Sequence, residues 1–226
     1  MRAAGAALAA SLLALATAGC TAPASAETAV AAPAAKRQAA EPAGLKTAIF
    51  AGGCFWGVEA VFSHVKGVTG AVSGYHGGTR AAASYDLVSS GVTDHAEAVR
   101  VTYDPRIVRY DQLLRIFFSV VADPTLKNRQ GPDVGAPYRA ALVPTSPEQR
   151  AVARAYLAQM RASGVWKAPI VTGIEPAQTF YPAETYHQDF AAKNPRHGYI
   201  LRWDAPKVAA LKRLYPALYS PGFLRD

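Results

Sequence analysis

A strand-to-helix turn around Cys54 is the feature that most constrains this fold. An apolar run at residues 47–50 passes through Gly52 and Gly53 into an amphipathic stretch at residues 57–62. A helix N-terminus carries partial positive charge and unpaired N–H groups, and both favour a thiolate over a thiol. We therefore expect Cys54 to begin a helix, with a pKa below its ordinary value and the reactivity of a nucleophile.

The chain has two cysteines, so a disulfide of Cys54 could use only Cys20. Residues 3–18 form an apolar run behind Arg2, too short to span a bilayer, and small residues precede Cys20. This ending resembles a bacterial lipobox, although Thr17 stands where Leu, Val or Ile is commoner. We expect residues 1–19 to be a lipoprotein-type export signal and Cys20 to be acylated.

These expectations place the protein in the bacterial periplasm, anchored to a membrane by the lipid on Cys20. Plain cleavage of the signal and an uncleaved anchor are the alternatives. If Cys20 is acylated it cannot pair with Cys54. If it is not, Cys20 could serve as the resolving cysteine.

The remaining composition predicts one domain behind a tether. Residues 20–44 are rich in Ala and Pro and lack a hydrophobic period, which is typical of a disordered tether. Half of the chain is hydrophobic, so residues 45–226 can fill one core, and we expect one catalytic domain and a monomer. The net charge of +8 is spread along the chain, densest over residues 196–213, without a nucleic-acid motif. We expect a solvated basic face and no nucleic-acid partner.

Strands and helices mix after Cys54 without strict βαβ order. Strands are predicted at residues 65–75, 95–103, 138–143 and 169–174, and helices at residues 110–121, 147–162 and 183–192. This order favours an α+β two-layer sandwich over a doubly wound parallel sheet.

Glu97 lies in the predicted strand at residues 95–103. By the period of two it shares a face with Val99, Val101 and Tyr103. A carboxyl among apolar side chains has its pKa raised by desolvation, so it stays protonated and can donate a proton near neutral pH. The alternative is that Glu97 lies at the solvent end of the strand or pairs with Arg100 or another cation.

Several blocks taken together resemble peptide methionine sulfoxide reductase, type A. The resemblance covers roughly residues 46–199. The blocks are Gly53-Cys54-Phe55-Trp56-Gly57, Ser84-Tyr85, residues 90–97, Asp123-Pro124-Thr125, residues 128–135, Tyr138-Arg139 and residues 181–188. The resemblance implies an α+β sandwich with a ferredoxin-like core and long coil segments.

The resemblance also implies a mechanism. Cys54 attacks the sulfur of methionine-S-sulfoxide, protein-bound or free, Glu97 protonates the oxygen, and Cys54 becomes a sulfenic acid. Tyr85, Asp133 and Tyr138 match family positions that hold the oxygen, water and acid. Phe55 and Trp56 match the walls that receive the methyl group; taken singly, either could be ordinary core. Oxidised envelope proteins are the expected substrates.

Some positions depart from the family pattern. Ile200 stands where many relatives carry the resolving cysteine, so we expect recycling by an external thiol, either small or on a thioredoxin-like donor. Ala122 replaces a frequent histidine, and Ala136-Pro137 precedes Tyr138 in place of Thr-Gln. No bound cofactor is implied.

The histidines show no metal-ligand spacing, so no metal site is expected. His187 could border the pocket or be structural. Two other functions remain open: a thiol peroxidase, which would leave Glu97 without a task, and a non-catalytic lipoprotein, which would tolerate Cys54→Ser.

Overall fold

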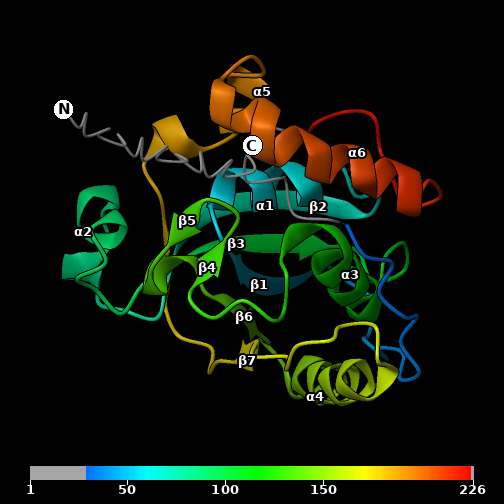
Figure 1. The fold of residues 1–226 in the computed structure, drawn as a ribbon. Helices are drawn as coiled ribbons and strands as arrows, with labels where there is room; N and C mark the ends of the chain where they lie inside the picture. Colours follow the sequence, from blue (N-terminus) through cyan, green and yellow to red (C-terminus); the bar gives the residue numbers. More distant parts are fainter. Residues whose placement is uncertain (1–28, 225–226) are drawn as a thin grey trace, which may run out of the picture.

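The computed structural model describes residues 29–224. The expected export signal, Cys20 and the first part of the expected tether lie outside the described residues. Figure 1 shows the arrangement of the elements. The strands are β1 Lys46–Gly52, β2 Val68–His76, β3 Ala96–Tyr103, β4 Arg129–Gln130, β5 Asp133–Val134, β6 Ala140–Val143, β7 Gly173–Ile174 and β8 Phe180–Pro182. The longer helices are α1 Phe55–Ser63, α3 Tyr110–Ile116, α4 Pro147–Ser163 and α6 Ala205–Leu214.

The main sheet confirms the α+β sandwich with a ferredoxin-like core. Its strand order is β7-β6-β1-β3-β2-β8, and β1 pairs antiparallel with both β3 and β6. With α1 between β1 and β2, and α3 between β3 and β6, the four central strands follow the ferredoxin-like β-α-β-β-α-β pattern. Short strands β7 and β8 extend the two edges, and β6 pairs with β7 in parallel.

Side chains alternate across the sheet as the period of two requires. Phe50 of β1 and Val99 of β3 enter the large core under the helices, whereas Ile49 and Ala98 enter a small second cluster on the other face. Because one face packs into a core rich in aromatic residues and the other into a cluster of Ala, Val and Ile, the register of β1 and β3 is fixed. Glu97 therefore points into the large core with Val99.

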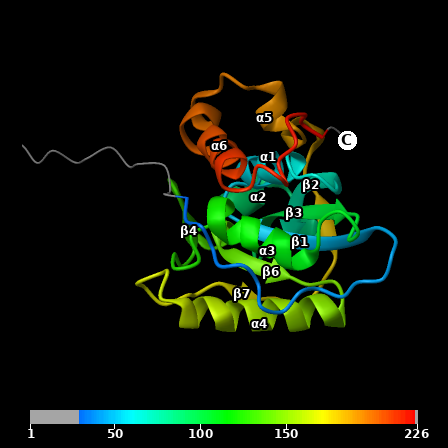
Figure 2. The same ribbon diagram turned by 90° about the vertical axis from the view of Figure 1, so that its right-hand side faces the viewer.

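Helices α1 and α3 cover the large-core face. The predicted helix at residues 110–121 is confirmed: α3 continues into a π-helical turn, η2 Phe117–Val121, whose Phe117 ring lies 5.5 Å from Phe50. Helix α4 begins where predicted, with Ser146 accepting from the Gln149 N–H and Gly164 left-handed at its end. It lies at the edge of the molecule opposite α5 Phe190–Lys193 and α6 (Figures 1 and 2).

Two predicted elements are wrong in part. Only Gly173 and Ile174 of the predicted strand at residues 169–174 pair with β6, because Val171 donates instead to the Pro124 carbonyl. The predicted helix at residues 183–192 is broken. A 3₁₀ turn, η4 Thr185–His187, is separated from α5 by Asp189, which has a φ of +56°. A residue in the left-handed region cannot continue a right-handed helix.

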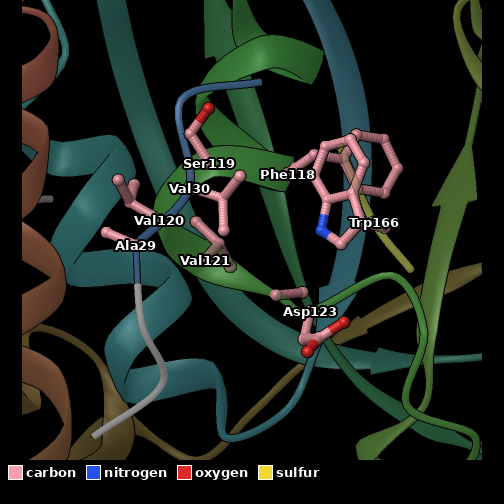
Figure 3. Close-up of a pocket in the computed structure, with 9 residues that line it drawn as sticks. Ala29, Val30, Phe118, Ser119, Val120, Val121, Asp123 and Trp166 are labelled. Carbon is pink, nitrogen blue, oxygen red and sulfur yellow. The ribbon is translucent and has the colours of Figure 1, made fainter. Parts of the chain in front are cut away.

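The described part of the expected tether, residues 29–44, is not disordered. The N–H groups of Val30 and Ala32 donate to the carbonyl and hydroxyl of Ser119, and the Ala39 N–H donates to Asp111. Composition predicted disorder because this segment lacks apolar periodicity, but groups of η2, α3 and α4 accept hydrogen bonds from its backbone. Figure 3 shows its start, Ala29 and Val30, against residues 119–121 at a cavity of about 220 Å³.

No helix among residues 29–224 combines the length and apolarity that a membrane span needs.

Candidate active site

Cys54 is the N-cap of α1, directly after the double glycine that ends β1. Gly53 has a φ of +85°, and a Cβ there would lie 2.6 Å from the Cβ of Gln130. A Cβ on Gly52 would lie 2.7 Å from the Phe117 ring. Only glycines fit this turn, because its backbone packs directly against Gln130 and Phe117. Cys54, the next residue, is partly exposed.

Glu97 reaches the same turn from the middle of the sheet. Its side chain is 1% exposed, and its Oε2 accepts the Phe55 N–H at 2.9 Å. Burial raises the pKa of Glu97 to about 8, against the lowering effect of the Phe55 N–H. Arg100 lies on the other face of the sheet, 5.1 Å from the Phe180 ring. Glu97 is therefore a buried, protonated acid, and neither the solvent-end nor the Arg100 alternative holds.

The expected low pKa of Cys54 is wrong for the resting protein. Burial raises the pKa of Cys54 well above its ordinary value, and the nearby carboxyl groups of Glu97, Asp204 and Asp133 raise it further. Only the hydrogen bond from the Trp56 N–H opposes them. The helix N-terminus is present as predicted, but one N–H group does not outweigh desolvation and three acids. Cys54 rests as a thiol.

The structure brings the other sequence-predicted polar residues around Cys54. Tyr85 begins the short helix α2 Tyr85–Ser89, and burial, followed by the charges of Glu97 and Cys54, raises its pKa to about 12. Burial and the charge of Glu97 also raise the pKa of Tyr138, which ends η3 Ala136–Tyr138. Asp133 in β5 accepts from the Tyr199 hydroxyl, and burial raises its pKa.

Phe55 and Trp56 enter an aromatic cluster. Phe55 is fully buried, with ring centroids of Tyr85 and His187 at 6.5 and 4.9 Å. Trp56 is half-buried and stacks on Phe190 at 3.8 Å. Its indole N–H donates to His187 Nδ1 at 3.0 Å. Burial lowers the pKa of His187, so a neutral imidazole accepts this bond, and His187 both borders the cluster and holds Trp56.

Sequence reasoning missed the C-terminal side of the site. Tyr199, Trp203 and Lys207 line a small cavity together with Cys54 and residues 130–133. Asp204 lies against the first turn of α1, where a Cβ on Gly57 would overlap its Oδ1. Asp204 is 2% exposed, and burial raises its pKa to about 7. The sequence did contain a signal for Asp204: it is a single acid within a basic stretch, close to the block that contains Ile200.

Ile200 shares an element with two of these residues but faces elsewhere. In the π-helical turn η5 Ile200–Asp204, Ile200 is buried and lines a groove of about 550 Å³ with Ala60 and His64. Tyr199 and Trp203 line the cavity at Cys54 instead. Position 200 thus packs into the interface of α1, α5 and α6.

Within residues 29–224, no group of three or more His, Cys, Asp or Glu side chains is arranged to hold a metal ion. Cys54 is a free cysteine there, and Cys20 lies outside the described residues.

A family model described as peptide methionine sulfoxide reductase matches residues 46–216, which contain every site residue above. The chain belongs to this family. It is an oxidoreductase, a peptide-methionine (S)-S-oxide reductase that converts methionine sulfoxide to methionine. Family membership selects the reductase over the thiol peroxidase and the non-catalytic lipoprotein that the sequence left open.

Relatives of this reductase align over most of their length. It is 55% identical over 177 residues to peptide methionine sulfoxide reductase MsrA 2 of Mesorhizobium japonicum, covering 78% of this chain and 91% of the relative. It is 51% identical over 168 residues to MsrA of Deinococcus radiodurans, covering 74% and 81%.

Solved structures agree on the fold. Reduced Mxr1 of Saccharomyces cerevisiae is similar with a TM-score of 0.62 and 33% identity, covering 72% of this chain and 92% of that one. Methionine sulfoxide reductase A of Corynebacterium diphtheriae is similar with a TM-score of 0.57 and 30% identity, covering 76% and 85%.

Proposed function

We propose that this reductase acts on methionine-S-sulfoxide, protein-bound and free, through a sulfenic acid on Cys54. The observation that carries the proposal is Glu97, an acid held on the Phe55 N–H beside the thiol, with a pKa of about 8. A carboxyl that is still protonated at neutral pH can act as a general acid.

In the proposed reaction, the Cys54 sulfur attacks the sulfoxide sulfur while Glu97 gives its proton to the sulfoxide oxygen. The sulfur–oxygen bond of the substrate breaks, the oxygen passes to Cys54, and methionine leaves. The substrate sulfur gains two electrons and the Cys54 sulfur loses two. The proton given up by the thiol balances the one that Glu97 donates, so this half of the cycle needs no other reductant.

Other residues have proposed supporting roles. Tyr85 and Tyr138 supply hydroxyl donors for the sulfoxide oxygen, since the pKa of each is raised above its ordinary value and each stays protonated. Asp133 orients the Tyr199 hydroxyl, which donates to it. Trp56, with Phe55 behind it, forms the apolar wall for the S-methyl group. An apolar wall on one side and donors on the other distinguish the two sulfoxide epimers.

An external thiol recycles the enzyme in this proposal. Ile200 cannot form a disulfide, and its side chain is buried in the groove with Ala60 and His64. A thiol from solution, small or carried by a thioredoxin-like protein, attacks the sulfenic acid and releases water. A second thiol then frees Cys54. No bound cofactor takes part.

We also propose that the chain works in the bacterial envelope. The support is the sequence alone: the apolar run at residues 3–18 and the small residues before Cys20. Acylation of Cys20 would anchor a monomeric enzyme beside oxidised envelope proteins. Membrane fractionation of cells that express wild type or Cys20→Ser tests this, and equal release of both into the soluble fraction would contradict the lipid anchor.

The reaction is tested in single turnovers. The chain without residues 1–19 and with Cys20→Ser is mixed with one equivalent of either epimer of methionine sulfoxide, without reductant. We expect methionine from the S epimer only, one added oxygen by mass, and reaction with a sulfenate-trapping reagent. Added dithiol should then complete the cycle. Equal rates for both epimers, or product from Cys54→Ser, would refute the proposal.

A further inference from the structure

A basic rim borders the Cys54 cavity on its C-terminal side. Residues 190–213 contain six cationic side chains and a single acid, Asp204. The cationic side chains are Lys193, Arg196, Arg202, Lys207, Lys212 and Arg213. Asp204 is buried, so it is not part of the surface. The preceding acid, Asp189, is buried, and its Oδ2 lies 3.6 Å from the Nζ of Lys193. The surface of this segment is therefore positive.

Two of these cations, Arg196 and Arg202, lie close to where a substrate would enter. Lys207 lines the Cys54 cavity itself, but its Nζ donates to the Val121 carbonyl at 2.9 Å. The Arg202 guanidinium lies 5.1 Å from the ring centroid of Trp203, which lines the same cavity. Arg196 precedes His197, whose ring centroid lies 6.0 Å from that of Trp56. Arg196 and Arg202 are exposed, so both can meet a partner in solution.

The side of the site near Tyr85 carries an acid. Glu184 accepts from the Tyr75 hydroxyl at 2.7 Å and from the Tyr85 N–H at 3.0 Å. The cluster of cations is formed by η5 and the turns around it. A substrate longer than one residue that extends over η5 would meet these cations.

We propose that the basic rim, defined as Arg196 and Arg202, selects methionine sulfoxide in acidic polypeptide segments. The proposal rests on the proposed function and adds its substrate class. Carboxylates next to the oxidised methionine would meet the rim while the sulfoxide occupies the site. Exposed charges of this kind raise the encounter rate and stabilise the complex modestly, and salt screens them over about 10 Å at 0.1 M.

The test compares three peptides that differ only beside the methionine sulfoxide, where they carry Glu, Gln or Lys. We expect kcat/KM to be highest for the Glu peptide and lowest for the Lys peptide, with differences that shrink as salt rises. Exposed charge pairs contribute modestly, so we expect roughly a two- to fivefold change for each rim charge engaged. Free methionine sulfoxide, assayed in parallel, reports the reaction itself.

Charge reversal on the rim gives the decisive variant. Arg196→Glu should lower kcat/KM for the Glu peptide about fivefold and reduce its preference over the Lys peptide. The matched control is Arg154→Glu, an exposed position on α4 at the opposite edge of the molecule (Figure 1). It makes the same change in net charge, and we expect it to leave the peptide preference unchanged.

Three results would overturn the proposal. One is equal kcat/KM for the three peptides while free methionine sulfoxide is still reduced, which would leave the proposed function intact. Another is an equal effect of Arg154→Glu and Arg196→Glu, which would assign the preference to net charge. The third is loss of binding to phosphatidylglycerol vesicles in Arg196→Glu with unchanged peptide preference, which would assign the rim to a membrane surface.

Discussion

The two buried carboxyl groups at the first turn of α1 come from different regions of the molecule and are held differently. Glu97 belongs to the central strand β3, and its Oε2 accepts the Phe55 N–H. Asp204 belongs to the C-terminal segment, packs on Gly57, and its Oδ2 accepts no hydrogen bond from the described residues. Burial raises the pKa of Glu97 to about 8 and that of Asp204 to about 7.

The two carboxyl groups differ in what holds them: the central sheet positions Glu97, and the C-terminal segment positions Asp204. Glu97 pairs with Tyr75 of β2, and the pairing of β3 with β1 begins two residues later at Val99, so the position of Glu97 follows from the register of this sheet. The C-terminal segment reaches the site through short turns and closes it from outside with Tyr199, Trp203 and Lys207. We infer that the core supplies the candidate acid, and that burial and both regions, through Glu97 and Asp204, raise the pKa of Cys54.

The largest expected effect comes from removing the core acid. Glu97→Gln retains an amide oxygen for the Phe55 N–H but cannot give up a proton. Sulfenate formation in a single turnover should therefore slow by about 10²–10⁴-fold, the usual contribution of general acid catalysis. Rapid-quench measurement of methionine at saturating S-sulfoxide tests this. A variant as fast as wild type would move the acid to another residue.

The same group predicts a pH profile. Because the pKa of Glu97 is raised to about 8, its protonated form prevails below pH 8 and is lost above it. The pKa of Cys54 is raised still higher, so the fraction of thiolate grows with pH over the range in which the fraction of protonated Glu97 falls. The single-turnover rate should therefore rise with pH up to about 8 and then level off if Glu97 is the required acid. In Glu97→Gln the slower rate should keep rising above pH 8 as the thiolate forms. A wild-type rate that also keeps rising tenfold per pH unit above 8 would contradict the assignment.

The packing of the two regions is probed at Gly57. Replacing glycine by alanine inside a helix ordinarily stabilises it by about 0.5–1 kcal/mol. Here the new Cβ would overlap Asp204 Oδ1, so Gly57→Ala should instead destabilise the protein by about 1–3 kcal/mol, as overpacking does. Urea unfolding measures the sign. The double variant Gly57→Ala/Asp204→Ala should recover part of the loss, and a stabilised single variant would show that the segment moves away freely.

The smallest effect should come from neutralising the C-terminal acid. An ionised Asp204 raises the pKa of Cys54, and Asp204→Asn removes that charge, so the pKa of Cys54 should fall. Alkylation of Cys54 by iodoacetamide at neutral pH should become several-fold faster, and its pH midpoint should move down. Arg154→Glu serves as the surface control. An unchanged midpoint would mean that Asp204 is neutral in the resting protein.

The sequence predicted the elements with a clear local signal. The double glycine before Cys54, the alternation that places Glu97 with Val99, and the Ser146 cap of α4 all appear in the structure as expected. Each depends on residues a few positions apart, so chain connectivity alone brings them together. The predicted helix at residues 183–192 failed because Asp189 adopts a left-handed conformation, with its N–H bound to Glu59 across the molecule.

By itself, the sequence identified the family and predicted the nucleophile and the acid, because these follow from motifs and from the period of a strand. Tertiary structure decided the charge state of Cys54, the order in residues 29–44 and the C-terminal side of the site. A pKa is the balance of burial and all nearby charges, and Asp204 lies 150 positions from Cys54 in the chain. Only packing of η5 and α6 on α1 brings that carboxyl group close enough to raise the pKa of the thiol.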